Sequence, residues 1–290
     1  MKFSFTSFCN YTFDWDPEKK LHTSLTLKEE NPDIGGGRIR MSDIDRLRDY
    51  PNEDTVTISG LRQDTFEYFI NTYGNQFKAI RFFKNKFIED WSLLGTLPNI
   101  QYLYFFFNQR IDQFWDMSTN HALTGLAVMD FSRIKNIELV NTAPRLEDFR
   151  IGNEIWSTMV IDSFMPLAGT PIRHLSCTAK NIMDQDLSFL DSMPYLETFN
   201  FTTNLFTTEQ VAWIAANHPE VSGCSITPYT GYPTDEKPDS DGWVVGKRKP
   251  FLKYIGNEVK ISKYEKAFNE LKIKYKGISY HDAFPNRKNA

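Results

Sequence analysis

A short hydrophobic pattern recurs along the middle of the chain. Each copy has two apolar residues separated by one residue, with a third apolar residue three positions before them, and this predicts a short strand with one face toward a core. The middle apolar residues are Val56 (in a partial first copy), Ile80, Leu103, Leu126, Phe149, Leu175, Phe199 and Cys224. They follow one another at intervals of 23–26 residues, so one structural unit is predicted to repeat along the chain.

Two further residue types keep the same period. Proline stops the preceding segment and delivers the chain extended into the strand, and it stands two residues before the first apolar position at Pro51, Pro98, Pro144, Pro194 and Pro219. Asparagine stands three residues after the last strand position at Asn85, Asn108 and Asn204. Its amide is suited to bond backbone groups of a turn that leaves the strand.

Residues 90–103 (DWSLLGTLPNIQYL) and 186–199 (DLSFLDSMPYLETF) resemble leucine-rich repeats of the short bacterial type. The resemblance covers residues ~51 to ~230, and its period lies within the 20–29 residues of that family. It implies an α/β solenoid, or horseshoe, with a parallel sheet on the concave side and a short helix or turn outside. Phe, Ile and Cys often replace Leu, and asparagine occupies its column in only three of about eight units.

The repeats are predicted at residues 51–230, between two terminal caps that shield the ends of the stack. Residues 1–50 read as an N-terminal αβ cap, with strands at Met1–Phe8 and Leu21–Leu27 and a helix at Ser42–Asp49 that begins at an N-cap serine. Residues 231–290 read as a basic C-terminal segment with one helix near Ser262–Lys276, which the helical spacing of its apolar residues predicts. We expect this segment to be the second cap.

Charge is unevenly distributed between these parts. The chain carries 33 Lys and Arg and 37 Asp and Glu, a net charge of −4. Residues 229–290 hold 13 basic and 8 acidic residues, a net +5, which leaves 20 basic and 29 acidic residues, a net −9, for residues 1–228. The basic segment reads as a solvated capping helix on an acidic body, or as a surface for a partner such as nucleic acid.

Composition predicts a globular, cytoplasmic protein. Hydrophobic residues make up 41%, no apolar run approaches the ~18 residues of a membrane span, and the first ten residues alternate apolar with polar, unlike a signal peptide. Three cysteines are too few for a disulfide framework, and Cys177 and Cys224 fall on predicted core positions. We therefore expect no membrane contact.

The sequence shows little catalytic chemistry. Its five histidines are scattered without metal-ligand spacing, and it has neither Cys-x-x-Cys nor Gly-x-Ser-x-Gly. Residues 242–248 (GWVVGKR) differ from a phosphate loop in glycine spacing and lack its hydroxyl residue. We expect no catalytic residue, no metal and no cofactor, and hence a protein that is not an enzyme.

Residues between the core positions of each strand are expected to lie on the concave face. In units two to four these positions gather aromatic and basic side chains, a composition typical of interaction hot spots. The predicted partner-binding residues are Arg81, Phe83, Tyr102, Tyr104, Phe106, Met129, Asp148 and Arg150.

The sequence thus predicts a non-enzymatic scaffold that binds a protein or peptide through this aromatic face, as the resemblance also implies. Two alternatives stay open. The chain's own N-terminal cap or C-terminal tail covers the aromatic side chains, or the repeats are an adaptor whose basic C-terminal segment binds nucleic acid or carries a small enzymatic activity. Because the net charge is negative, we do not expect nucleic acid as the main partner.

Overall fold

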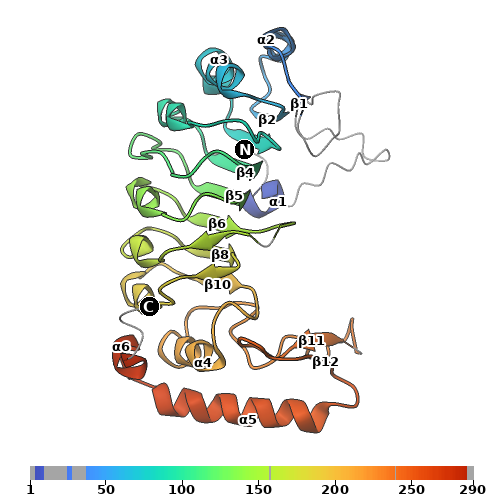
Figure 1. Ribbon diagram of the computed structural model, residues 1–290, viewed down its shortest axis with the longest axis vertical. Helices are drawn as coiled ribbons and strands as arrows, with labels where there is room; N and C mark the ends of the chain where they lie inside the picture. Colours follow the sequence, from blue (N-terminus) through green and yellow to red (C-terminus); the bar gives the residue numbers. More distant parts are fainter. Residues whose placement is uncertain (1–3, 10–24, 28–36, 157, 239, 286–290) are drawn as a thin grey trace.

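Eight parallel strands form one sheet in the computed structural model, which describes residues 4–9, 25–27, 37–156, 158–238 and 240–285 (Figure 1). The strand order in the sheet is β1-β2-β3-β4-β5-β6-β8-β10, so the chain adds strands in one direction. The strands are β1 (Leu25–Leu27), β2 (Thr55–Ser59), β3 (Ala79–Phe83), β4 (Tyr102–Asn108), β5 (Gly125–Phe131), β6 (Asp148–Gly152), β8 (His174–Thr178) and β10 (Thr198–Phe201). The protein is therefore of the α/β class with a large parallel sheet.

The register of the sheet follows the predicted hydrophobic pattern. Ile80 lies opposite Leu103, Leu103 opposite Leu126, and Leu126 opposite Phe149 on neighbouring strands. The ladder continues to Leu175 and Phe199. All of these side chains are buried, so the interval of 23–26 residues in the sequence corresponds to one strand of the sheet.

Short helical segments connect the strands, and Figure 1 shows them stacked along one side of the sheet. One connection is the helix α3 (Gln63–Tyr73), and a parallel pair, β7 (Val160–Ile161) with β9 (Asn181–Ile182), lies in two others. Further helical segments between the strands are 3-10 helices at Asp45–Asp49, Gly74–Gln76, Ser92–Thr96, Glu138–Thr142, Met165–Leu167 and Ser188–Ser192. Five of the six bury at least one apolar side chain in the main core, and Gly74–Gln76 buries Gly74; this packing keeps such short segments ordered.

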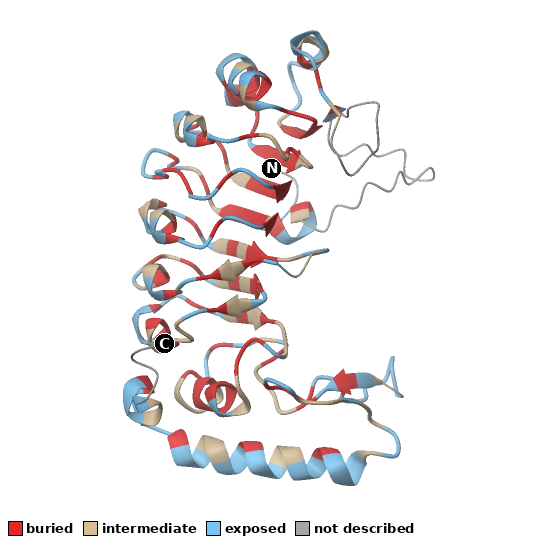
Figure 2. Cartoon of the chain, in the orientation of Figure 1, coloured by how far each residue is buried: buried red, intermediate tan, exposed pale blue. Residues whose placement is uncertain are grey.

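The main core lies between the sheet and these connections (Figure 2). It contains two of the three predicted asparagines. Asn85 donates to Ile58 O (3.0 Å), and Asn108 donates to Asn85 O (2.7 Å), so neighbouring units are joined by buried amides. Asn204 is exposed, and the prediction for this third residue is wrong.

The N-terminal elements differ in part from the predicted ones. Residues Phe5–Cys9 form a helix, α1, where we predicted a strand at Met1–Phe8, and residues 1–3 lie outside the described residues. β1 confirms the end of the strand predicted at Leu21–Leu27, of which residues 21–24 are not described. The next helix, α2 (Met41–Ile44), begins after Arg40, whose N–H donates to Asp43 (2.9 Å), so Ser42 is not its N-cap.

The C-terminal elements begin where the sheet ends. Residues 221–226 make one isolated bridge, Ser222 to Thr198, in place of the last predicted strand, and Cys224 is exposed instead of buried, whereas Cys177 is buried as expected. The helix α4 (Thr208–Asn217) precedes this segment, and the hairpin β11 (Asp241–Trp243) and β12 (Phe251–Lys253), α5 (Glu258–Tyr275) and α6 (Tyr280–Ala283) follow it. α5 covers the range of the predicted C-terminal helix and packs against α4.

Within the described parts of the chain, we find no helix whose length and apolar character would let it cross a membrane.

Candidate functional site

The eight predicted binding residues lie together on the face of β3–β6 that is turned away from the main core. They alternate along each strand with core residues, as the period of two requires. Their burial differs from the expected exposed cluster: Arg81, Tyr104 and Phe106 are only 4%, 5% and 4% exposed. The other five, Phe83, Tyr102, Met129, Asp148 and Arg150, are half-buried.

The helix α1 covers this face. Its side chains Phe5 and Phe8 are buried, and both rings contact Tyr102, with centroids 5.3 and 5.9 Å away. Together with the buried strand residues they form a second hydrophobic cluster, separate from the main core. Burial of each Phe side chain contributes about 1.5–3 kcal/mol. Of the two alternatives left open by the sequence, self-coverage by the N-terminal segment is the one that these contacts support.

Arg81 connects α1 to the sheet. Its guanidinium donates to the carbonyl oxygens of Phe8 and Cys9, the latter at 3.0 Å, and lies 4.3 Å from the centre of the Tyr104 ring. The carbonyls at the C-terminal end of a helix have no partner within the helix and carry partial negative charge, which suits a buried cation. Arg81 therefore recognises the end of α1 through its backbone.

Arg150 makes a second polar contact. It donates to Thr6 Oγ1 (2.6 Å) from the strand β6 and lies 5.3 Å from the centre of the Phe5 ring. Asp148, two residues earlier on the same strand, accepts from Arg150 Nε (3.3 Å) and so holds the guanidinium in place. Both ends of α1 are thus tied to arginines on different strands.

Gly125 leaves room for α1. A Cβ at this position would lie 2.5 Å from Phe5 Cγ, closer than real Cβ contacts come. The first residue of β5 must therefore lack a side chain for the Phe5 ring to rest on the sheet.

The loop after β6 forms one rim of the site. The carboxylate of Asp130 accepts three backbone N–H groups, from Glu154, Ile155 and Trp156, at 2.9–3.1 Å. This arrangement places Glu154 so that it accepts from Tyr104 OH (2.5 Å), and it packs Trp156 against Phe107, whose ring centre is 4.7 Å away.

Burial shifts the titration of the site toward neutral forms. It raises the pKa of the Cys9 thiol to about 12 and also raises the pKa of Tyr104, which donates to Glu154. Burial raises the pKa of Asp148 as well, against the opposing effect of Arg150. The site thus combines aromatic surface, two guanidinium groups, and a hydroxyl and a thiol that stay protonated at neutral pH.

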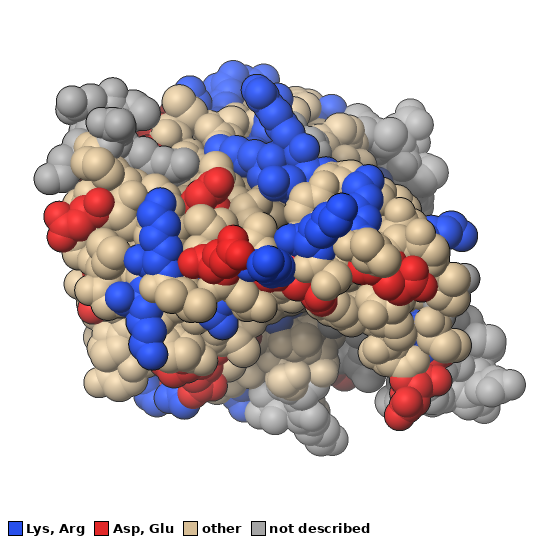
Figure 3. All heavy atoms as spheres, turned by 90° about the horizontal axis from the view of Figure 1, so that it is seen from below, with Lys and Arg blue, Asp and Glu red and all other residues tan. Residues whose placement is uncertain are grey.

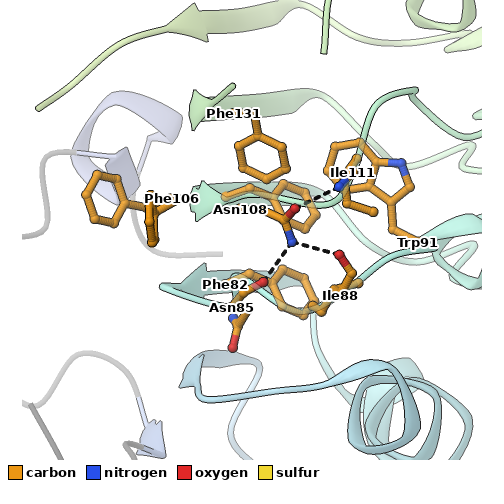
Figure 4. A pocket seen from close by; sticks show the side chains of 10 residues that line it. Phe82, Asn85, Ile88, Trp91, Phe106, Asn108, Ile111 and Phe131 are labelled. Atoms are coloured by element: carbon orange, nitrogen blue, oxygen red, sulfur yellow. Dashed lines mark hydrogen bonds between the residues drawn. The ribbon is translucent and has the colours of Figure 1, made fainter. Parts of the chain in front are cut away.

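The main core also encloses a small cavity. It lies beside Asn108, and its volume of about 10 Å³ is no larger than one water molecule needs. Figure 4 shows the hydrogen bonds that the Asn108 side chain makes there. Over the residues that the structure describes, no group of three or more His, Cys, Asp or Glu could hold a metal ion.

The C-terminal face carries mixed charge. Figure 3 shows Lys and Arg gathered on this side of the molecule, with Asp and Glu between them. α5 contains five Lys and three Glu, so its net charge is modest. On the neighbouring hairpin, Trp243 and Phe251 are about half exposed, and their ring centres are 5.0 Å apart.

Sequence reasoning missed residues of the site on α1, at the end of β5 and in the loop after β6, among them Phe5, Phe8, Asp130 and Glu154. Phe5 and Phe8 are three residues apart, which is helical spacing, but the alternation at Phe3 and Phe5 also fitted a strand. No sequence signal connects Asp130 with the loop that it holds.

A scan against models of known protein families and a search of curated proteins both find no match for this chain.

Proposed function

We propose that the chain is a leucine-rich-repeat-like solenoid, or horseshoe, and a non-enzymatic scaffold that binds a protein or peptide on the concave face of β3–β6, the face turned away from the main core. The sequential order of the parallel strands, the 3-10 helices that connect them and the buried amides of Asn85 and Asn108 support the repeat assignment. Three free cysteines suit the reducing cytoplasm predicted from the sequence.

The observation that carries the binding role is the way the site holds α1. The helix lies on the sheet through two aromatic side chains and through its backbone carbonyls, which are contacts of the kind seen when a helical peptide fills a groove. A face that binds one short helix in this manner offers the same contacts to a helix from another protein.

Peptide selection tests this function. Random peptides displayed on phage are selected on the full chain, and their affinity is then measured for the variants Arg81→Met and Phe251→Ala. We expect Arg81→Met to weaken the selected peptides about tenfold or more, because it removes a buried donor, and Phe251→Ala on the distant hairpin to have no effect. The proposal would be refuted if the selected peptides bound Arg81→Met as tightly as they bind the unaltered chain, provided that the melting temperature shows this variant to be folded.

A second candidate function is nucleic-acid binding by the C-terminal segment, favoured by the exposed Trp243 and Phe251 beside the basic residues 247–249. Such a site stacks bases on aromatic rings and binds phosphates with cations. Affinity for single-stranded oligonucleotides would then fall steeply with salt, and substitution of Lys247, Arg248 and Lys249 would weaken it uniformly. Binding that is insensitive to salt would exclude this function.

A further inference from the structure

The helix α1 contacts the sheet through one of its faces, as a bound peptide ligand does. Phe5 and Phe8 are buried, while Ser4, Thr6 and Ser7 are exposed. The cluster beneath α1 lies across the sheet from the main core, which includes neither of these two phenylalanines. The strands β3–β6 are therefore fully paired and packed on their core side without any contribution from α1.

The site is also selective for what it holds. Gly125 makes space for one aromatic ring, Tyr102 contacts both rings, and Arg81 donates to backbone carbonyl oxygens that point at it. These features specify two aromatic side chains three residues apart in a helical turn that ends at Arg81.

We infer that α1 is an internal competitor: it occupies the site in place of a segment of another protein that carries the same Phe-x-x-Phe turn. The inference rests on the proposed function and adds to it the chemistry of the partner and the means of regulation. The partner displaces α1, and α1 sets the concentration of partner that is needed.

The covalent connection makes the competition strong. Only residues 10–24 separate α1 from β1, and a segment tethered at this distance has an effective concentration of roughly millimolar. A free peptide with the same contacts is outcompeted at micromolar concentration. Removal of Phe5 and Phe8 should open the site without touching the strands.

The main experiment compares three full-length chains: the unaltered protein, the double variant Phe5→Ala with Phe8→Ala, and Ser7→Ala, which changes only the exposed side of α1. The probe is a fluorescein-labelled synthetic peptide of residues 2–12 that carries Cys9→Ser, and its binding is followed by fluorescence anisotropy. We expect the double variant to bind the probe at least tenfold more tightly than the other two chains. Equal affinity for all three would overturn the inference.

Two further variants identify the site of binding. Addition of Arg81→Met to the double variant should weaken the probe at least tenfold, and a probe with both phenylalanines changed to alanine should not bind. Binding that survives either change would place the probe elsewhere and overturn the inference.

A measurement on the unaltered chain covers the case in which the double variant does not fold. Excess unlabelled probe should accelerate alkylation of Cys9, because displaced α1 exposes this half-buried thiol, whereas the already exposed Cys224 should react at an unchanged rate. No acceleration at millimolar probe would contradict displacement. Elution of the unaltered chain as a dimer would show that the site takes α1 of a second copy, which also overturns the inference.

The outcomes separate this inference from the proposed function. If phage-selected peptides bind in an Arg81-dependent way but the N-terminal probe does not, the face binds peptides and α1 is not their competitor. If neither binds to a folded chain, both proposals fail.

Discussion

Residues that leave the strands adopt an unusual backbone conformation, and this determines which side chain enters the core. Gly60, Lys84, Phe107 and Asp130 occupy equivalent positions in successive units, and all have φ between 55° and 77°. This left-handed turn directs the next residue inward, and Leu61, Asn85, Asn108 and Phe131 are accordingly buried. Either an amide or a hydrophobic side chain satisfies the position, which explains why asparagine recurred in only part of the column.

Asn108 should be among the most sensitive of these residues. Its amide donates to Asn85 O and Ile88 O and accepts from the N–H groups of Arg110 and Ile111, at 2.7–2.9 Å. Asn108→Ala leaves these backbone groups without partners, so we expect a loss of about 2–4 kcal/mol in the free energy of unfolding, measured by urea denaturation. Asn204→Ala, at the exposed position of the same column, should change it by less than about 0.5 kcal/mol. Equal losses would mean that the buried amides do not stabilise the stack.

Tyr104 tests the rim of the site at the same scale. Tyr104→Phe keeps the ring under Arg81 and removes only the hydroxyl that donates to Glu154. Because the Glu154 side chain is exposed enough to be hydrated, we expect a loss of about 1 kcal/mol. Thermal and urea denaturation measure this, with Tyr195→Phe, which is 58% exposed, as the matched control. A loss as large as that of Asn108→Ala would indicate that Glu154 is needed to hold its whole loop.

The elements of the sheet were predictable because one period determines both their spacing and their burial. A strand that faces a core on one side must alternate, and units that stack must repeat at nearly constant length, so β2–β6, β8 and β10 lie where the pattern placed them. The helix α1 was not predictable in this way. Five residues are too short for local propensity to decide, and the conformation depends on Tyr102 and Gly125, which lie about a hundred residues away in the sequence.

The prediction of a last strand at residues 221–226 was wrong for a different reason. Residues 221–226 have the apolar spacing of the other predicted strands, but Gly223 lies against the backbone of Phe199, and the chain bends after the single bridge between Ser222 and Thr198. An apolar pattern therefore predicts which residues suit a strand and leaves open whether a following unit is present to continue the sheet.

Gly125→Ala tests how α1 is seated, with Cys9 as the reporter. The new methyl group displaces the Phe5 ring and loosens α1. In the unaltered chain burial raises the pKa of Cys9 to about 12, so the reactive thiolate is a fraction of roughly 10⁻⁴ at pH 8 and grows about tenfold per pH unit. We expect the variant to lower this pKa and to increase the rate of Cys9 alkylation at pH 8 at least tenfold.

Peptide-resolved mass spectrometry measures this rate. Cys224, which is exposed and distant from α1, serves as the internal control and should react equally in both chains. An unchanged rate for Cys9 would show that the Phe5 ring does not hold the helix on the sheet.

On the scale of the whole molecule, the proposed stack of layers requires that its last layer be covered. At the C-terminal end the helices α4, α5 and α6 supply it. Trp213 of α4 donates to Ile278 O (2.8 Å), and Asn217 donates to Tyr275 O (3.0 Å), so the cover is joined by side chains to backbone. Its outward surface is exposed and charged, as Figures 2 and 3 show.

Tyr280 is the side chain on which this cover depends most. It is 1% exposed, its ring packs 5.1 Å from that of Trp213, and its hydroxyl accepts from Gln210 (2.8 Å). Tyr280→Ala removes a large buried ring and should lower the free energy of unfolding by about 3–5 kcal/mol, whereas Ile273→Ala, at a position 79% exposed on α5, should change it by less than about 0.5 kcal/mol. Hydrogen exchange in Tyr280→Ala tests the stacking itself. Because layers in a stack depend on their neighbours, the backbone amides of β8 and β10 should lose protection in this variant before those of β3 and β4. Equal loss of protection in all strands would mean that the sheet unfolds as one cooperative unit, and the description of the molecule as a stack of separable layers would then be wrong.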